Sequence, residues 1–160
     1  MLDKEGYRPN VGIILCNQVN HVFWARRTGQ DGWQFPQGGM RSHETPEQAM
    51  FRELEEEVGL LDSHVELIGR TADWLHYDVP SRMQRRQQEG EFRGQKQIWF
   101  LLRFIGDEQD VQLDKHGQPE FDDWRWVEYW EPLNRIIEFK REVYHQALSE
   151  LEPLLMISDE

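Results

Sequence analysis

Residues 38–60 read GGMRSHETPEQAMFRELEEEVGL, and the second half of this stretch predicts a helix. Pro46 is favoured in a first helical turn, and Thr45 just before it can accept hydrogen bonds from the free amides. Gly59 is typical of the residue at which a helix ends. Apolar residues gather on one side of this helix, which we expect to pack on the core: Met50, Phe51, Leu54 and Val58.

Three glutamates share a different side of the same helix. Glu53, Glu56 and Glu57 are spaced i, i+3 and i+4, whereas Glu55 points away from them. Carboxylates this close repel one another, so at least one should have a raised pKa unless a cation neutralises them. Oxygen ligands of this kind suit Mg²⁺ or Mn²⁺. Arg52 is predicted to hold Glu56 by a paired hydrogen bond. Taken alone, such a cluster is more typical of a solvated acidic helix face than of a metal site.

The spacing of the whole stretch is more specific than its glutamates. Gly38 is followed by five residues, Glu44, seven residues and then the run RELEEEVGL that starts at Arg52. This pattern resembles the Nudix box, G-x5-E-x7-R-E-U-x-E-E-x-G-U with U an apolar residue, at every defined position. The resemblance implies a hydrolase that cuts a diphosphate linkage attached to another group. It implies Mg²⁺ as the cofactor, with Mn²⁺ as the alternative and more than one ion.

The same resemblance assigns roles to individual residues. The metal ligands are three glutamates of the helix, one of which doubles as the base: Glu53, Glu56 and Glu57. Gly38 contributes its main-chain carbonyl to the metal site, and Glu44 and Arg52 support the loop and helix. Glu120, in the segment PEFDD, is a further candidate ligand or base, because related enzymes often draw a carboxylate from outside the box. The alternative for Glu120 is a solvated loop acid.

Composition narrows the class of protein. A chain of 160 residues with 38% hydrophobic residues predicts one domain, residues 1–160, with a real core. No apolar run approaches a membrane span, the first residues are not an apolar signal, and the lone Cys16 lies in a buried-looking run, which together favour the cytoplasm. The net charge of −12 argues against extended contact with a nucleic acid, but it does not exclude binding to one end of a nucleic acid.

The rest of the chain alternates strands and loops. We expect strands at residues 11–16, 21–26, 65–69, 74–79, 97–104 and 124–127, and a short extended piece at 33–36. Residues 80–94 and 106–120 are expected to be loops, the first of them long and mobile, and residues 139–155 a long amphipathic helix. Strands on both sides of one central helix, with a last helix behind, predict an α+β sandwich. The Nudix resemblance implies a mixed sheet between helices.

Segments outside the box point to one branch of the family. GYRPNVG, WQFPQGG, GQKQ-WFLL, PEFD-WRWV and FKREVY resemble the bacterial RNA pyrophosphohydrolases, which are related to the asymmetric dinucleoside polyphosphate hydrolases. This branch removes pyrophosphate, or phosphate, from the 5′ end of RNA and so initiates mRNA decay. Candidate contacts to RNA or phosphate are Arg8, Arg27, Tyr77, Ile137, Phe139 and Lys140. For the aromatic residues, the alternative is ordinary core packing.

Two other readings stay open at this point. A dinucleoside polyphosphate hydrolase would present a polyphosphate to the same metal site, so the box does not separate it from an RNA enzyme. An inactive Nudix module would bind a nucleotide without turnover, although no charge needed for metal binding is missing. The expected partners are therefore 5′-triphosphorylated or diphosphorylated RNA and nucleotide polyphosphates, with no membrane or DNA partner. The sequence is silent on protein partners.

Overall fold

The computed structural model describes residues 2–87 and 90–158. Within these residues, eight strands form one mixed sheet in the order β10-β2-β1-β9-β5, while β3 pairs with β2, β4 with β1 and β6 with β9. The strands are β1 (Tyr7–Cys16), β2 (Val22–Arg27), β3 (Trp33–Gln34), β4 (Gln37–Gly39), β5 (Val65–Arg70), β6 (Leu75–Asp78), β9 (Gly94–Phe104) and β10 (Phe121–Val127). The helices are α1 (Pro46–Val58), α2 (Glu131–Arg135) and α3 (Arg141–Ser158), with 3₁₀ turns at η1 (Asp62–His64), η2 (Ser81–Met83), η3 (Glu108–Asp110) and η4 (Glu138–Lys140).

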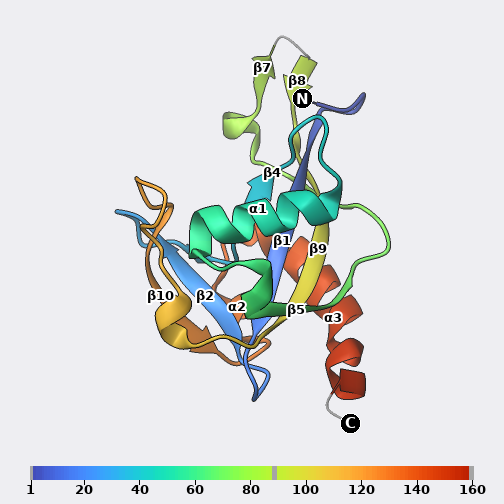
Figure 1. The fold of residues 1–160 in the computed structure, drawn as a ribbon. Helices are drawn as coiled ribbons and strands as arrows, with labels where there is room; N and C mark the ends of the chain where they lie inside the picture. Colours follow the sequence, from blue (N-terminus) through green and yellow to red (C-terminus); the bar gives the residue numbers. More distant parts are fainter. Residues whose placement is uncertain (1, 88–89, 159–160) are drawn as a thin grey trace.

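Helices cover both faces of the sheet. Figure 1 shows α1 lying across one face and α3 behind the other. Because side chains alternate along a strand, β1 supplies both layers: Val11 and Ile13 pack in the cluster beneath α1, and Ile14 and Cys16 in the cluster beneath α3. This arrangement confirms the predicted α+β sandwich. Among the described residues, no helix is both long and apolar enough to span a membrane.

The two central strands, β1 and β9, run parallel. Their register pairs Tyr7 with Gly94 and Cys16 with Arg103. Two buried polar side chains fix each other between them, since Gln97 Nε2 donates to Asn10 Oδ1 over 2.9 Å. Among the described residues, the other strand pairs of this sheet are antiparallel, which makes the sheet mixed as the family resemblance implied.

Helix α1 begins and ends where its sequence predicts. Thr45 Oγ1 accepts from the Gln48 amide, and the Gln48 side chain accepts from the Thr45 amide, so two free helix amides are satisfied. Gly59 ends the helix with φ 80°, a left-handed conformation that suits glycine, and its amide donates to Glu55 O. Met50 and Leu54 are fully buried on the sheet. The opposite edge of α1 is therefore left for polar side chains.

The stretch WQFPQGG connects the sheet to α1. Phe35 is fully buried, and its amide donates to Tyr144 Oη of α3 over 3.0 Å. Pro36 O accepts from the Ile13 amide, and β4 then pairs with β1, opposite Val11 at Gly38. The core thus fixes the backbone that approaches the polar edge of α1.

One expected loop contains regular structure. Residues 80–94 were expected to be a long mobile loop, but part of this prediction is wrong: β7 (Arg85–Gln87) and β8 (Gly90–Phe92) form an antiparallel hairpin. Residues 88–89 lie outside the described residues. The hairpin continues into backbone hydrogen bonds from Arg93 to Gly6 and from Val79 to Arg93. A hairpin can be held by main-chain hydrogen bonds alone. This polar segment therefore lacks the alternation of apolar and polar residues that usually predicts a strand.

Candidate active site

The glutamates of α1 face a cleft whose opposite wall comes from the loop before β10. The cleft has a volume of about 410 Å³ and is lined by Glu53, Glu56, Glu57, His116, Gln118 and Glu120. The structure therefore brings Glu120, which is far away in sequence, to the three glutamates of the predicted motif. Four carboxylates therefore face one small space.

Burial makes two of these carboxylates hard to ionise. Glu53 is 8% exposed, and burial raises its pKa despite the opposing effect of Arg52. Burial also raises the pKa of Glu57 well above its usual value, and the charges of Glu53 and Glu120 add to the effect. One oxygen of Glu57, Oε2, is buried and has no hydrogen-bond partner among the described residues. The raised pKa expected from the helical spacing is thus present.

Arg52 holds several of these carboxylates close together through hydrogen bonds. Its guanidinium donates to Glu53 over 2.7 Å and to Glu56 over 3.2 Å. The paired hydrogen bond, however, joins Arg52 to Glu44 rather than to Glu56 as predicted: Nη2 donates to Oε1 over 2.8 Å and Nε to Oε2 over 2.5 Å. This pairing lowers the pKa of Glu44 to about 2. Glu44 also accepts from the Arg41 amide, which ties the loop to the helix.

Gly38 allows Glu53 to lie against the backbone of β4. A Cβ atom built at Gly38 would meet Glu53 Cδ at 2.1 Å, closer than any real contact. A Cβ at the neighbouring Gly39 would meet nothing within 4 Å. The glycine of the motif is therefore needed where the carboxylate approaches, and its neighbour is not.

The residues present fit a hard divalent cation. Within residues 2–87 and 90–158, no three acidic, histidine or cysteine side chains lie in an arrangement that could hold a metal ion as they stand. Two observations nevertheless favour a cation: the buried, unpaired oxygen of Glu57, and the space at Gly38 reserved for the Glu53 carboxylate. Oxygen donors of this kind match Mg²⁺ or Mn²⁺.

A second cleft lies beside the first and has an apolar wall. It has a volume of about 590 Å³, and its lining includes Arg27, Trp33, Met83, Ile137, Phe139 and Lys140. Ile137 is 54% exposed and leaves an apolar surface open in this cleft. Arg27 belongs to this cleft, and its Nε lies 3.9 Å from Glu120 Oε1 in the carboxylate cleft. The two clefts therefore meet at this ion pair.

Lys140 is a partly buried cation on the wall of the second cleft. Its Nζ donates to Gln37 Oε1 over 3.3 Å and lies 5.7 Å from the centre of the Tyr77 ring. Burial, helped by the nearby charge of Arg27, lowers the pKa of Lys140 to about 8. Tyr77 itself is 7% exposed and packs against Phe139 at 6.0 Å between ring centres. Tyr77 thus lies beneath Phe139 and Lys140 instead of forming an open surface.

A family comparison decides the class of protein to which this site belongs. A family model described as the NUDIX domain matches residues 6–147. The chain belongs to the Nudix family. It is therefore a hydrolase of the class that acts on pyrophosphate bonds, with the Mg²⁺ dependence that is typical of Nudix enzymes.

Solved structures agree on the Nudix fold. The E. coli dihydroneopterin triphosphate pyrophosphohydrolase matches with a TM-score of 0.69 and 20% identity, over 90% of this chain and 98% of that one. A C. elegans Ap4A hydrolase binary complex matches with a TM-score of 0.66 and 15% identity, over 93% and 98%. The NUDIX domain of Shewanella oneidensis NrtR, complexed with ADP ribose, matches with a TM-score of 0.53 and 17% identity, over 91% and 88%. At these identities the shared property is the fold.

The residues that line the two clefts differ in part from those that the sequence predicted. Arg8 is outside the residues that line either cleft, and its guanidinium lies 5.0 Å from the centre of the Phe92 ring. Sequence reasoning missed Trp33 and Met83 in the second cleft and His116 in the first. Trp33 had a usable signal, because it begins the segment WQFPQGG that resembles the family. Met83 and His116 lie in polar loops, which offered none.

Proposed function

We propose that this Nudix hydrolase converts the 5′-triphosphate or 5′-diphosphate end of RNA to a monophosphate. It releases pyrophosphate or phosphate and, in the cytoplasm, initiates mRNA decay. The observation that carries the proposal is the junction of the two clefts at the Arg27–Glu120 pair. A nucleotide base in the apolar cleft would direct its 5′ phosphates past Arg27 toward the carboxylates. A single-stranded RNA end offers both groups, an unpaired base and a polyphosphate.

The apolar cleft supplies the groups that bind such an end. Phe139 and Ile137 offer an apolar surface to a base, and Tyr77 supports the Phe139 ring from below. Arg27 and Lys140 offer positive charge to phosphates at the side nearest the carboxylates. A few local cations are enough for this purpose, since only the end of the RNA is held, and the net charge of −12 disfavours longer contact.

The carboxylate cleft supplies the groups for hydrolysis. Glu53, Glu56, Glu57, Glu120 and the main-chain carbonyl of Gly38 would hold Mg²⁺ or Mn²⁺. When bound, such ions lower the pKa of water and neutralise phosphoryl oxygens. One of the glutamates accepts the proton of the attacking water, as the phosphorus–oxygen bond to the leaving phosphate breaks. Arg52 and Glu44 keep the carboxylates in place.

The first test compares substrates. RNA with a labelled 5′-triphosphate and diadenosine tetraphosphate are offered to the enzyme with Mg²⁺ at equal concentrations. We expect a higher kcat/KM on the RNA, with labelled pyrophosphate and a monophosphorylated RNA end as products. A clearly higher kcat/KM on the dinucleotide would instead indicate that the enzyme removes dinucleoside polyphosphates. Nucleotide binding without turnover on either substrate would make it a sensing module.

A second prediction concerns the base. Phe139→Ala should lower kcat/KM for RNA about tenfold or more, since a stacked base contributes about 1–3 kcal/mol. Hydrolysis of a free nucleoside triphosphate should fall by a similar factor, because its own base can occupy the same cleft. RNA with abasic 5′ nucleotides is the matched control, because the variant should lose little on it. Equal losses on all three substrates would contradict a stacking role, and the melting temperature of the variant reports any loss of packing.

The dinucleoside polyphosphate reading remains the runner-up. An adenosine would fit the same apolar cleft, and its phosphates would reach the same carboxylates. The C. elegans neighbour is an Ap4A hydrolase, although at 15% identity that likeness carries only the fold. The substrate comparison above separates the two readings directly.

A further inference from the structure

The loop between β9 and β10 is tethered at two points, one at the C-terminal end of α1 and one just before β10. On one side, the Gln112 amide donates to Val58 O, the last residue of α1, over 2.9 Å. On the other side, Thr28 Oγ1 donates to Pro119 O over 2.7 Å, just before β10. The intervening residues 113–118 are therefore held between two fixed points beside the cleft.

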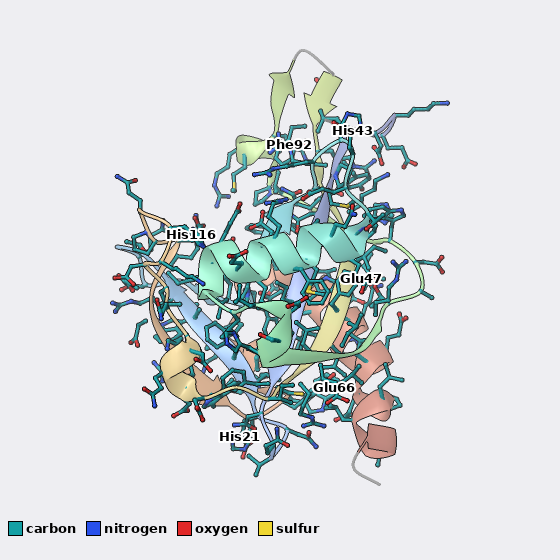
Figure 2. The ribbon with its side chains drawn as sticks, viewed as in Figure 1. His21, His43, Glu47, Glu66, Phe92 and His116 are labelled. Atoms are coloured by element: carbon teal, nitrogen blue, oxygen red, sulfur yellow. The ribbon has the colours of Figure 1, made fainter. Side chains whose placement is uncertain are left out.

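His116 lies in this tethered part of the loop. It lines the carboxylate cleft, and Figure 2 shows it near the C-terminal end of α1, at the opposite end from Glu47. Its Nε2 lies 3.8 Å from Glu55 Oε1. Unlike Glu53, Glu56 and Glu57, Glu55 does not line the cleft, so it can pair with the imidazole without giving up a candidate metal ligand. The structure thus gives His116 a defined position at the rim.

The charge of the cleft makes this position informative. Its lining consists of four glutamates, the neutral Gln118 and His116, so His116 is the one basic side chain among the residues that line it. Arg27 lines the second cleft and lies next to Glu120. A polyphosphate that passes Arg27 and extends over the carboxylates comes within the cleft that His116 also lines. A terminal phosphate needs a donor there, since neighbouring glutamates only repel it.

We infer that His116 is a phosphate-binding residue whose imidazole N–H donates to the terminal phosphate of the substrate, the phosphate farthest from the nucleoside. The inference rests on the proposed direction of the substrate, with the nucleoside at Arg27 and the polyphosphate over the carboxylates. It does not require the substrate to be RNA. The contact selects for polyphosphate length, and a chain one phosphate shorter does not reach it.

The experiment removes the side chain and the phosphate separately. His116→Ala and His116→Gln are assayed on RNA with a 5′-triphosphate and on the same RNA with a 5′-diphosphate. His116→Ala should lower kcat/KM on the triphosphate about 10- to 100-fold, the range expected for a hydrogen bond to a charged group. It should change little on the diphosphate. His116→Gln keeps an N–H donor and should recover part of the loss.

The controls separate a substrate contact from a structural one. His64 makes a similar 3.8 Å pair with Asp110 but does not line the cleft. His64→Gln should therefore leave kcat/KM unchanged on both the triphosphate and the diphosphate RNA. Equal losses on both RNA ends, or no loss on either, would overturn the inference. Should the wild-type enzyme prefer dinucleotides, the RNA proposal fails. The His116 test then uses diadenosine tetraphosphate and triphosphate in the same way.

Discussion

Glu57→Gln is expected to lower kcat about 100- to 1,000-fold, since charge stabilisation at such a site supplies several kcal/mol and about 1.4 kcal/mol is tenfold. The substitution keeps the shape of the side chain and removes its charge. Without metal, the buried Glu57 carboxyl is already hard to ionise, because burial and neighbouring acids raise its pKa. A neutral amide should therefore fold as well as the wild type.

The decisive readout combines activity with stability. Mg²⁺ should raise the melting temperature of the wild-type enzyme, since a ligand that binds only the folded state stabilises it. Glu57→Gln should lose much of this increase while its metal-free melting temperature stays equal or rises. Glu56→Gln should behave likewise in kcat. Glu47→Gln, an exposed glutamate of the same helix, is the matched control and should keep wild-type values. Wild-type turnover in Glu57→Gln would exclude it from the metal site.

Gly38→Ala should be nearly as damaging to catalysis, although it adds only a methyl group. The new Cβ would lie 2.1 Å from Glu53 Cδ, so the carboxylate must move. A displacement of about 1 Å at a catalytic group can cost about 100-fold in rate, and we expect a loss of that order in kcat/KM. The fold should persist, because the clashing atoms are at the end of a side chain.

The neighbouring glycine provides the comparison. Gly39→Ala puts its methyl group in open space and should leave kcat/KM close to wild type. The two variants are assayed side by side at several Mg²⁺ concentrations, with melting temperatures measured for each. If Gly39→Ala were as inactive as Gly38→Ala, the loss would come from the backbone of β4 and not from displacement of Glu53.

The sequence was most informative where covalent spacing sets the geometry. The face shared by Glu53, Glu56 and Glu57 follows from the helical repeat alone, and so does the buried face at Met50. The caps of α1 were predictable for the same reason, because Thr45 and Gly59 act on their immediate neighbours. Helix periodicity and capping depend only on residues close in sequence, so they can be predicted without the arrangement of the sheet.

The remainder of the site depends on tertiary contacts that spacing does not encode. Glu120 reaches the cleft only because β10 pairs with β2, a strand order that the sequence did not reveal. Arg52 had several acids within reach, and its paired hydrogen bond went to Glu44, across the loop that precedes α1, instead of to Glu56 along the helix. Tyr77 looked available for stacking, but η4 covers it. Each of these outcomes depends on which elements become neighbours after folding.

The parallel pairing of β1 with β9 also bears on how the chain is made. Asn10 and Gln97 are 87 residues apart in sequence, yet their side chains are hydrogen-bonded at the centre of the sheet. Contacts between such distant residues form late and slow folding, because a long loop must close first. On the ribosome, the apolar β1 therefore waits for its central partner until β9 has been synthesised. The catalytic helix is complete well before then, but the sheet that holds it in place is among the last parts to assemble.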